Sequence, residues 1–338
     1  MNVLLTGGAG YIGSHTALAF TEAGHQVTIA DNLLNSSVES IRRVERLTGQ
    51  SIDFHQLDLL DLAGLDALFA QHAFDAVVHF AGLKAVGESV AKPLAYYQNN
   101  IGSTLNLIEV MERHHVNQLV FSSSATVYGD PQRIPIDETC QIIDAKSPYG
   151  RTKLFIEKIL EDVCHANPDF NVARLRYFNP GGAHESGEIG EDPQGMPNNL
   201  MPFVTQVAVG KREKLVVFGD DYATPDGTCV RDYIHVVDLA MGHLAAVKKL
   251  SSKPGMVTYN LGTGIGYSVL DIIKAFETAN NLTLPYTIGP RREGDIASCY
   301  ADAGKAREEL GWHTTKDLQA ICRDAWRWQQ QYPDGYLS

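Results

Sequence analysis

The segment SPYGRTK, residues 147–153, places a tyrosine and a lysine where they could carry out acid–base chemistry together. Pro148 suits the first turn of a helix, where its missing N–H costs nothing. In such a helix, the i, i+4 spacing puts Tyr149 and Lys153 on the same face. A lysine ammonium beside a phenol favours the phenolate and lowers the tyrosine pKa, which ordinarily lies near about 10. The pair could therefore take a proton from a hydroxyl group. The alternative is an exposed helix with an incidental Tyr/Lys pair.

The N-terminal stretch MNVLLTGGAGYIGSHTALAF has the pattern of a dinucleotide-binding turn. A strand is predicted over residues 2–6, and a helix follows the glycines. Gly8, Gly10 and Gly13 have the spacing that allows a tight turn, backbone approach to a pyrophosphate and close helix–strand packing. The next predicted strand, HQVTIAD, ends at Asp31, whose carboxylate can bind a ribose 2′-hydroxyl and would repel a 2′-phosphate. The pattern favours NAD over NADP. A structural glycine turn with a capping aspartate is the alternative.

Strand and helix signals then alternate along the first half of the chain. SIDFHQLDL predicts a strand that ends near Asp58, FDAVVHFAG a strand that leads into a small-residue loop, and NQLVFSSSATVYG a strand followed by serines. NVARLRYFNP predicts another strand, which Pro180 closes. This alternation predicts an α/β fold with a Rossmann-type doubly wound parallel sheet. In such sheets ligands bind beyond the carboxyl ends of the strands.

Ser124 follows one predicted strand, and Tyr149 begins a predicted helix, so both could lie near a bound nicotinamide. A tyrosine tuned towards neutral pH could take a proton from a sugar hydroxyl while hydride leaves the same carbon. Ser124 could hold that hydroxyl by a hydrogen bond. Loss of the charge at Lys153 should then reduce both catalysis and cofactor binding.

Composition limits the classes of partner. The chain has 338 residues, enough for two lobes, with 44% hydrophobic and 20% charged residues. The net charge of −12 argues against nucleic acid or an anionic membrane as a partner. Five separated cysteines without a CxxC pair favour a reducing cytoplasm, and the twelve histidines lack a metal-ligand spacing, so we predict no metal. No apolar run has the length of a membrane span, and no signal peptide is predicted.

Longer motifs carry a family resemblance. They are TGGAGYIGSH, DNL.NSS, HFAGLKAVGES, FSSSATVYG, SPYG..K, RYFNP.GAH, PNNLMP, RDYIHV and PRREGD, and they extend from Met1 to the C-terminal GY. With them the chain resembles the UDP-glucose 4-epimerases, which are extended short-chain dehydrogenases/reductases. The resemblance implies a homodimer that interconverts UDP-galactose and UDP-glucose and holds NAD tightly.

The resemblance also assigns contacts. The catalytic residues would be Tyr149, Ser124 and Lys153. The cofactor contacts would be Gly7, Gly10, Tyr11, Ile12, Gly13, Asp31, Asn32, Asn35, Ser36, Asp58, Leu59, Phe80, Ala81, Gly82, Lys84, Asn99, Ser122, Tyr149, Lys153 and Phe178. The substrate contacts would be Lys84, Ser124, Tyr149, Asn179, Asn199, Leu200, Val216, Phe218, Arg231, Arg292, Asp295 and Cys299. Guanidinium forks suit a diphosphate, although an ion pair with Asp232 competes for Arg231.

The resemblance further implies two domains. The NAD-binding domain would hold residues 1–180 and about 232–262, and a smaller C-terminal α/β domain for the UDP-sugar would hold 181–231 and about 263–338.

Three rival functions remain. A nucleotide-sugar 4,6-dehydratase of the same fold would need an acid/base pair, and relatives of that kind carry TDE where this chain has Ser124-Ala125-Thr126. An ordinary NAD-dependent dehydrogenase would exchange its cofactor. A non-catalytic NAD sensor could lose the tyrosine or the lysine, and here both are present.

Three positions depart from the family pattern. Gly181 stands where relatives commonly have an aliphatic residue, and Cys229 stands where they usually have glycine, so a positive φ there would strain the loop that bears Arg231. Cys299 stands where some members have a tyrosine against the hexose. The smaller side chain predicts that N-acetylated UDP-hexosamines are epimerised as well. A buried thiol without a role in specificity is the alternative.

Overall fold

The computed structural model of the protein describes residues 1–292 and 295–337. It consists of two compact units, each made of segments that are separated in the sequence. Unit 1 holds Met1–Gly129, Ile142–Arg176 and Ala240–Tyr259, and unit 2 holds Asp130–Gln141, Tyr177–Leu239 and Asn260–Ser338.

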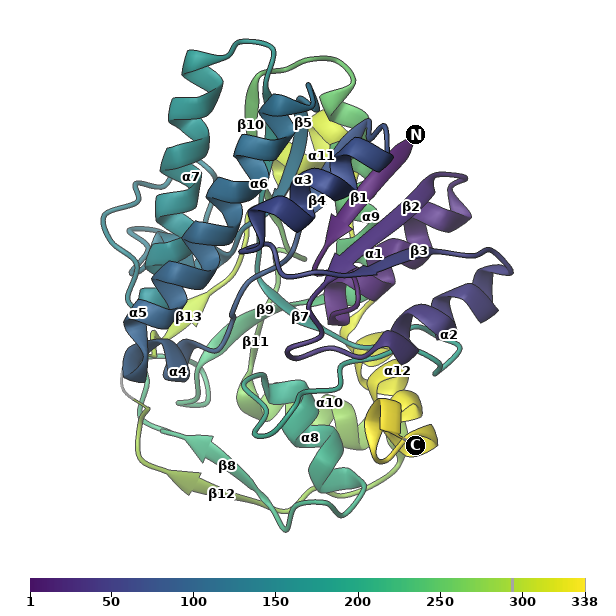
Figure 1. Cartoon of the computed structure of the whole chain (residues 1–338). Coiled ribbons are helices and arrows are strands. Elements are labelled where there is room, and N and C mark those ends of the chain that lie inside the picture. The colour runs from purple at the N-terminus through teal and green to yellow at the C-terminus, as the bar shows by residue number, and fades with distance from the viewer. Residues whose placement is uncertain (293–294, 338) are drawn as a thin grey trace. The chain divides into compact units, whose positions relative to one another are not determined.

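The larger sheet belongs to unit 1. In the described residues it has seven strands in the order β10-β6-β5-β4-β1-β2-β3, and β1 to β6 pair in parallel (Figure 1). The strands are β1 (Asn2–Thr6), β2 (Gln26–Asp31), β3 (Asp53–Gln56), β4 (Ala76–His79), β5 (Gln118–Ser122), β6 (Asn171–Tyr177) and β10 (Met256–Leu261). This order confirms the predicted doubly wound parallel sheet. The chain places β2 and β3 on one side of β1 and then crosses back to place β4, β5 and β6 on the other side.

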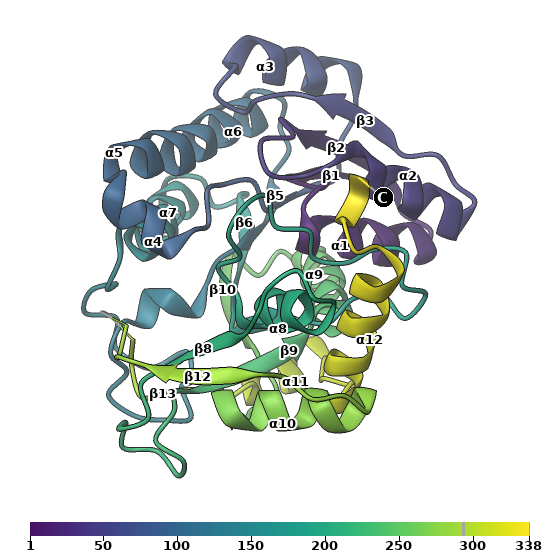
Figure 2. The same ribbon diagram turned by 90° about the horizontal axis from the view of Figure 1, so that it is seen from below.

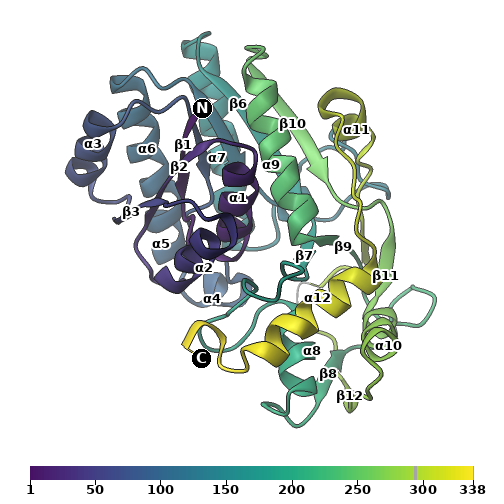
Figure 3. The same ribbon diagram turned by 90° about the vertical axis from the view of Figure 1, so that its right-hand side faces the viewer.

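Helices cover both faces of this sheet. They are α1 (Tyr11–Glu22), α2 (Val38–Thr48), α3 (Leu62–Gln71), α4 (Val86–Ala91), α5 (Pro93–Tyr96), the π-helical η1 (Tyr97–Ile101), α6 (Gly102–Arg113), the 3₁₀ turn η2 (Ala125–Tyr128), α7 (Pro148–Ala166) and α9 (Val236–Leu250). Apolar side chains of α3, α6 and α7 form one buried core with the strands. Figure 3 shows α1, α2 and α9 on the opposite face.

Unit 2 combines two small sheets with helices. In one sheet β9 (Val230–His235) pairs with β7 (Asn179–Gly181), β11 (Gly266–Ser268) and β13 (Ser298–Cys299), and in the other β8 (Leu215–Phe218) pairs with β12 (Tyr286–Gly289). The helices are α8 (Leu200–Ala208), α10 (Val269–Asn280), α11 (Gly304–Leu310), α12 (Leu318–Gln331) and the 3₁₀ turn η3 (Gly335–Leu337). Leu215, Val217, Phe276 and Ile321 belong to the apolar core shared by α8, α10 and α12. These three helices are labelled in Figure 2.

Two local expectations need correction. Pro180 does not close the preceding strand, because a second short strand, β7, contains it and pairs in parallel with β9. The two units divide the chain differently from the expected domains, because residues 130–141, 177–180, 232–239 and 260–262, which we expected in the first domain, lie in unit 2. Strand β9 finds its partners in β7, β11 and β13, which its own sequence could not reveal.

In the described residues, no helix combines the length and the apolar content that a membrane crossing requires.

Candidate active site

The glycine turn between β1 and α1 leaves no room for side chains. Gly7 has φ +72°, and a Cβ at this position would lie 2.7 Å from the backbone nitrogen of Ala81. A Cβ at Gly13 would collide with the backbone of Gly7 and Gly8. Gly10 is the N-cap of α1, so the helix begins without a side-chain cap over its first N–H groups. Such a bare, positively polarised helix end fits a pyrophosphate, and Tyr11 and Ile12 form its first turn.

Asp31 ends β2 and is already held by its surroundings. Its carboxylate accepts hydrogen bonds from the backbone N–H groups of Ala9 (3.0 Å) and Leu33 (2.9 Å) and from the Ser36 hydroxyl (2.9 Å). The carboxylate can accept about four hydrogen bonds, so capacity for a ribose hydroxyl remains. These contacts fix the carboxylate beside the glycine turn, where a dinucleotide would need it.

The ends of β2 and β3 are joined by a further hydrogen bond. Asn32 donates its amide N–H to Asp58 at 3.1 Å, and Asp58 also accepts the backbone N–H of Leu60 at 2.9 Å. Leu59, which follows Asp58 in the sequence, is buried, and Asn35 lies in the loop after β2. The predicted cofactor residues that follow β2 and β3 therefore lie at neighbouring strand ends.

The loop after β4 is held by a residue that sequence reasoning missed. Phe80, Ala81, Gly82 and Lys84 lie in this loop, and Asn99 lies in η1. The buried side chain of Asn100 accepts the N–H of Leu83 (2.7 Å) and donates to the carbonyl of Leu83 and to the Thr152 hydroxyl (both 3.0 Å). Because Thr152 lies on α7, Asn100 connects the loop after β4 to the helix that carries Tyr149.

Helix α7 begins as the SPYG motif predicts. Pro148 occupies its first turn, and the Ser147 hydroxyl accepts the backbone N–H of Gly150 at 3.1 Å. A Cβ at Gly150 would lie 3.4 Å from the carbonyl oxygen of Thr126, so the first turn of α7 packs against η2. Tyr149 is buried in this turn.

Ser124 caps η2 beside the start of α7. Its Oγ accepts hydrogen bonds from the backbone N–H (3.2 Å) and the hydroxyl (3.0 Å) of Thr126. These two donors orient the serine, and its own O–H can still be donated to a substrate oxygen.

Lys153 is buried one turn beyond Tyr149. Its Nζ donates to the carbonyl of Ser122, at the end of β5, at 2.8 Å, and lies 4.8 Å from the centroid of the Phe121 ring. Burial lowers the pKa of Lys153 to about 8, and the nearby Glu157 carboxylate opposes this shift. The helix thus delivers an ammonium group to the carboxyl edge of the sheet, where the predicted chemistry needs it.

A buried network supports this lysine from the next turn of α7. Glu157 accepts the hydroxyl of Ser123 at 2.6 Å and pairs with the guanidinium of Arg176 at 2.5 Å. Arg176 in turn donates to the Tyr128 hydroxyl at 3.1 Å. The network ties α7 to the end of β5 and to η2. Sequence reasoning missed it, because its members are dispersed along the chain.

Unit 2 contains a cluster of opposite charges. Asp295 accepts hydrogen bonds from Arg292 at 2.9 and 3.2 Å, and Arg231 Nη2 lies 3.7 Å from Asp295 Oδ1. Arg231 also donates to the carbonyl of Ile296 at 2.8 Å. The Asp232 carboxylate instead accepts hydrogen bonds from the backbone N–H groups of Thr263, Gly264 and Ala301. The ion pair between Asp232 and Arg231 that we considered as an alternative is therefore replaced by these contacts. The three predicted substrate residues 231, 292 and 295 are therefore brought together.

Aromatic and small side chains lie around this cluster. The Arg292 guanidinium lies 5.8 Å from the centroid of the Phe218 ring, and Val216 is exposed on the same side of β8. Cys299 is the partner of Arg231 across the parallel β13–β9 pair. Burial raises the pKa of the Cys299 thiol to about 11, so this side chain is an uncharged thiol at neutral pH.

The remaining predicted substrate residues lie elsewhere in unit 2. Asn179 pairs in β7 with Tyr233 of β9. Asn199 is the N-cap of α8, ahead of Leu200, and its amide donates to Glu191 at 2.8 Å. Phe178 also belongs to unit 2, unlike the other predicted cofactor residues.

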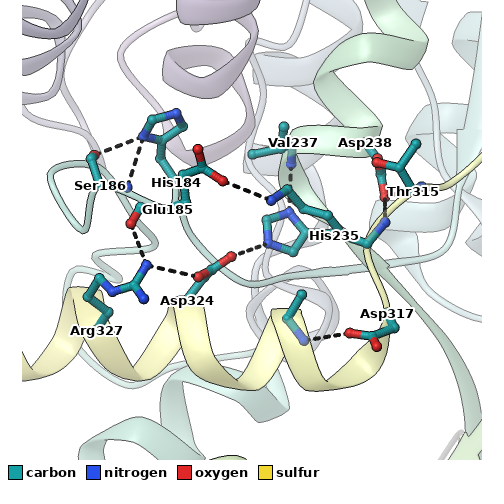
Figure 4. Close-up of polar contacts among 12 residues, drawn as sticks. His184, Glu185, Ser186, His235, Val237, Asp238, Thr315, Asp317, Asp324 and Arg327 are labelled. Carbon is teal, nitrogen blue, oxygen red and sulfur yellow. Dashed lines mark hydrogen bonds and ion pairs between the residues drawn. The ribbon is translucent and has the colours of Figure 1, made fainter.

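Strand β9 is anchored at its far end by a buried histidine (Figure 4). His235 Nε2 lies 3.2 Å from the Asp324 carboxylate on α12, and its Nδ1 accepts the N–H of Val237 at 3.1 Å. Because Nδ1 accepts, the imidazole donates its Nε2–H to Asp324. Asp324 also pairs with Arg327 at 3.2 Å. This clamp fixes the strand that carries Arg231.

The structure explains two of the departures from the family pattern, Cys229 and Gly181. Within the described residues, Cys229 is absent from the non-glycine residues with positive φ, so the suggested strain does not arise. A Cβ at Gly181 would lie 3.1 Å from a methyl group of Ile321 on α12, so the glycine makes room for this core side chain. Both positions are compatible with an undistorted β7–β9 region.

Known proteins match this chain over nearly its full length. A family model described as GDP-mannose 4,6 dehydratase matches residues 4–325. The UDP-glucose 4-epimerase of Mus musculus is 58% identical over 340 residues, which cover 99% of this chain and 98% of that protein. The UDP-glucose 4-epimerase of Bacillus subtilis is 55% identical over 338 residues, covering 100% and 99%.

A solved structure agrees with these sequences. The UDP-glucose 4-epimerase of Bifidobacterium longum, in complex with NAD⁺ and UDP, superimposes with a TM-score of 0.97 at 52% identity and covers 99% of this chain and 100% of its own. The motifs, the doubly wound sheet, the helix that carries Tyr149 and Lys153 and these full-length matches lead to one assignment. The chain belongs to the UDP-glucose 4-epimerase family of extended short-chain dehydrogenases/reductases.

Proposed function

We propose that the protein is an isomerase that interconverts UDP-galactose and UDP-glucose with tightly bound NAD, the reaction of EC 5.1.3.2. The observation that carries this proposal is the placement of Lys153, which is buried one helical turn from Tyr149 and bound to the end of β5. Full-length identities of 55–58% to UDP-glucose 4-epimerases support it.

The cofactor would bind at the carboxyl edge of the larger sheet. The glycine turn would hold the pyrophosphate, and Asp31 would hold a ribose hydroxyl. When bound, NAD would supply a reversible acceptor for the hydride that leaves C4 of the hexose. A 4-keto sugar would form in this way and be reduced again when the hydride returns.

The chain's own residues handle the proton. Tyr149 takes the proton of the 4-hydroxyl, and the Ser124 O–H holds the same oxygen in place. The Lys153 ammonium stabilises the phenolate electrostatically. After the sugar turns its other face inward, Tyr149 returns the proton to the new hydroxyl, so no net oxidation occurs.

Residues of unit 2 would bind the nucleotide sugar. Arg231 and Arg292 would hold the diphosphate, because guanidinium groups bind phosphate oxygens in a bidentate manner. Asp295, Asn179 and Asn199 would meet polar groups of the sugar or the nucleoside. The small side chain of Cys299 would leave space for an N-acetyl group, so UDP-N-acetylhexosamines would also be epimerised.

A 4,6-dehydratase is the second candidate, because the matching family model bears such a description. Ala125 and Thr126 supply no carboxyl group, and the Thr126 hydroxyl donates to Ser124. A dehydratase needs a proton donor and acceptor for the loss of water, so the geometry favours epimerisation.

One assay tests the proposal. Purified protein is incubated with UDP-galactose without added NAD, and the products are separated. UDP-glucose supports the proposal, whereas a 4-keto-6-deoxy sugar supports the dehydratase. Dependence on added NAD would favour an ordinary dehydrogenase, and no product at all would favour a non-catalytic sensor.

Two further properties complete the proposal. The protein would work as a homodimer. It would also work in the cytoplasm, since all five cysteines are free thiols in the structure.

A further inference from the structure

A group of metal-ligating side chains lies in unit 1, apart from the cofactor residues. Asp53, His55 and His72 each offer one ligand atom, and these atoms all lie within 4.8 Å of one another. We propose that they bind a divalent transition metal ion, with Zn²⁺ as the reference ion.

The fold explains how a sequence without a metal-ligand spacing builds this group. Asp53 and His55 lie two residues apart on β3, so their side chains point to the same face of the strand. His72 is the C-cap of α3, which leads from β3 back to the sheet. Strand β3 is the edge strand of the larger sheet. The three ligands therefore come together only after α3 has packed.

Each imidazole lies at a zinc-like separation from the Asp53 carboxylate, but from a different one of its two oxygens, so the carboxylate would bind the ion through both oxygens or turn to offer one. His55 Nε2 lies 3.2 Å from Asp53 Oδ1, and His72 Nε2 lies 3.4 Å from Asp53 Oδ2. Zinc–nitrogen and zinc–oxygen bonds of about 2.0–2.2 Å place neighbouring ligands of a tetrahedron about 3.3–3.5 Å apart. Two imidazoles and one carboxylate also match the donor preference of zinc, and water would occupy the fourth position.

Two further observations point to a ligand at this place. His55 Nε2 is shielded from solvent and, in the part of the chain that the structure describes, makes no hydrogen bond of suitable geometry, although Asp53 Oδ1 lies 3.2 Å away. The His72 ring is fixed, because it stacks on Phe74 with 5.4 Å between centroids and 14° between planes. A ring nitrogen in this position without a well-aligned hydrogen bond is unfavourable, and a metal ion shared with Asp53 would satisfy it. The Asp53 side chain is 51% exposed, which gives an ion access from solvent.

A metal ion here would connect the edge strand to the end of α3. Strand β3 pairs with β2 on one side, and its other side is the sheet edge. An ion that binds only the folded arrangement stabilises it by mass action. The function of the site would thus be stability of the sheet edge, separate from the chemistry at the carboxyl ends of the strands.

The test uses full-length, untagged protein that has been treated with EDTA and retains its own NAD. Titration with ZnSO₄ in a non-chelating buffer is followed by calorimetry. We expect one Zn²⁺ per chain. His55→Ala and His72→Phe should each weaken binding at least about tenfold. Phenylalanine keeps the stacking on Phe74 and removes both ring nitrogens.

His114→Ala is the matched control, because His114 lies in unit 1 and pairs with a single carboxylate, Asp66, at 2.9 Å. This variant should bind Zn²⁺ like wild type, and saturating Zn²⁺ should raise the melting temperature of both. The proposal is overturned if wild type shows no saturable binding. It is also overturned if His55→Ala and His72→Phe bind as tightly as wild type, which would place the ion on other groups such as the cysteine thiols.

Discussion

At the scale of single residues, the site depends on one buried ammonium group. Lys153 carries its charge at the end of β5, where burial alone would favour the neutral amine and lowers the pKa to about 8. A nearby carboxylate, Glu157, counteracts this effect. At neutral pH the lysine still carries its charge, because its pKa stays above 7, and a positive charge one helical turn from Tyr149 favours the phenolate.

Removal of the Tyr149 hydroxyl should abolish most of the epimerase activity. We expect Tyr149→Phe to lower kcat by about 10²–10⁴, because the variant keeps the ring but cannot accept the proton. Initial rates with UDP-galactose give the measurement. Tyr97→Phe is the control, since Tyr97 also lies in unit 1, where it stacks on Phe155. Rapid turnover by Tyr149→Phe would contradict the proposed role.

Lys153→Met should reduce both activity and cofactor content. The variant loses the charge beside Tyr149 and the contact with the Ser122 carbonyl. The rate and the NAD released after denaturation are measured together. Lys158→Met removes an exposed lysine of the same helix, which pairs with Glu161 at 2.8 Å, and should leave both values unchanged. Normal NAD content and normal turnover in Lys153→Met would exclude a role of the charge.

Cys299→Tyr should change the range of substrates. The larger ring would fill the space beside Arg231, so turnover of UDP-N-acetylhexosamines should fall much more than turnover of the plain UDP-hexoses. Both substrate types are assayed under the same conditions. Cys164→Ser serves as a control at a thiol in unit 1. Equal loss of both activities in Cys299→Tyr would show that the position does not determine specificity.

At the scale of elements, a buried histidine joins two strands and a helix of unit 1. The His79 ring at the end of β4 has Thr6 Oγ1 of β1 at 2.7 Å and Thr104 Oγ1 of α6 at 3.0 Å. Burial lowers the pKa of His79 to about 3, and the charge of Lys153 acts in the same direction. The ring is therefore neutral in the folded protein throughout the ordinary pH range.

This histidine should make the protein sensitive to acid. Below a pH of about 6.5 the unfolded chain binds a proton that the folded chain does not, so stability is present above that value and falls as pH decreases towards about 3. At pH 5 the expected loss is about 2 kcal/mol. Urea unfolding of wild type and His79→Gln at pH 7 and pH 5 measures the difference. An equal loss in both proteins would contradict this assignment.

The sequence was most informative for elements whose signals are local. The glycine turn, the SPYG helix start and the strand ends that carry Asp31 and Ser124 follow from spacing and turn chemistry. Asn100, the Glu157–Arg176 pair and the metal-ligand group could not be predicted in this way. Their partners are 19–52 residues away or lie on different elements, so only the packed fold brings them together.

At the scale of the whole molecule, exposed apolar side chains gather on packed elements of unit 1. Val90 of α4, Leu94 of α5 and Phe155 of α7 are 64%, 72% and 44% exposed. Such a group is typical of an interface, and a second copy of the chain is the partner that the family resemblance implies.

Leu94→Glu should therefore shift the proposed homodimer towards single chains. A charge at the centre of an apolar interface would be desolvated without a partner, which weakens association. Size-exclusion chromatography with light scattering gives the mass. Ile265→Glu, at an exposed apolar residue of unit 2, should leave the dimer intact. A wild-type protein with the mass of one chain would contradict the dimer.

The interleaved construction of the two units has a consequence for synthesis. The edge strand β10 follows β6 in the sheet but comes about eighty residues later in the chain, after about half of unit 2 has been made. A ribosome must therefore release residues up to 261 before the seven-stranded sheet can close along β6. Until then the growing polypeptide exposes an unpaired apolar strand edge, the kind of surface that chaperones recognise and that aggregates when translation stalls.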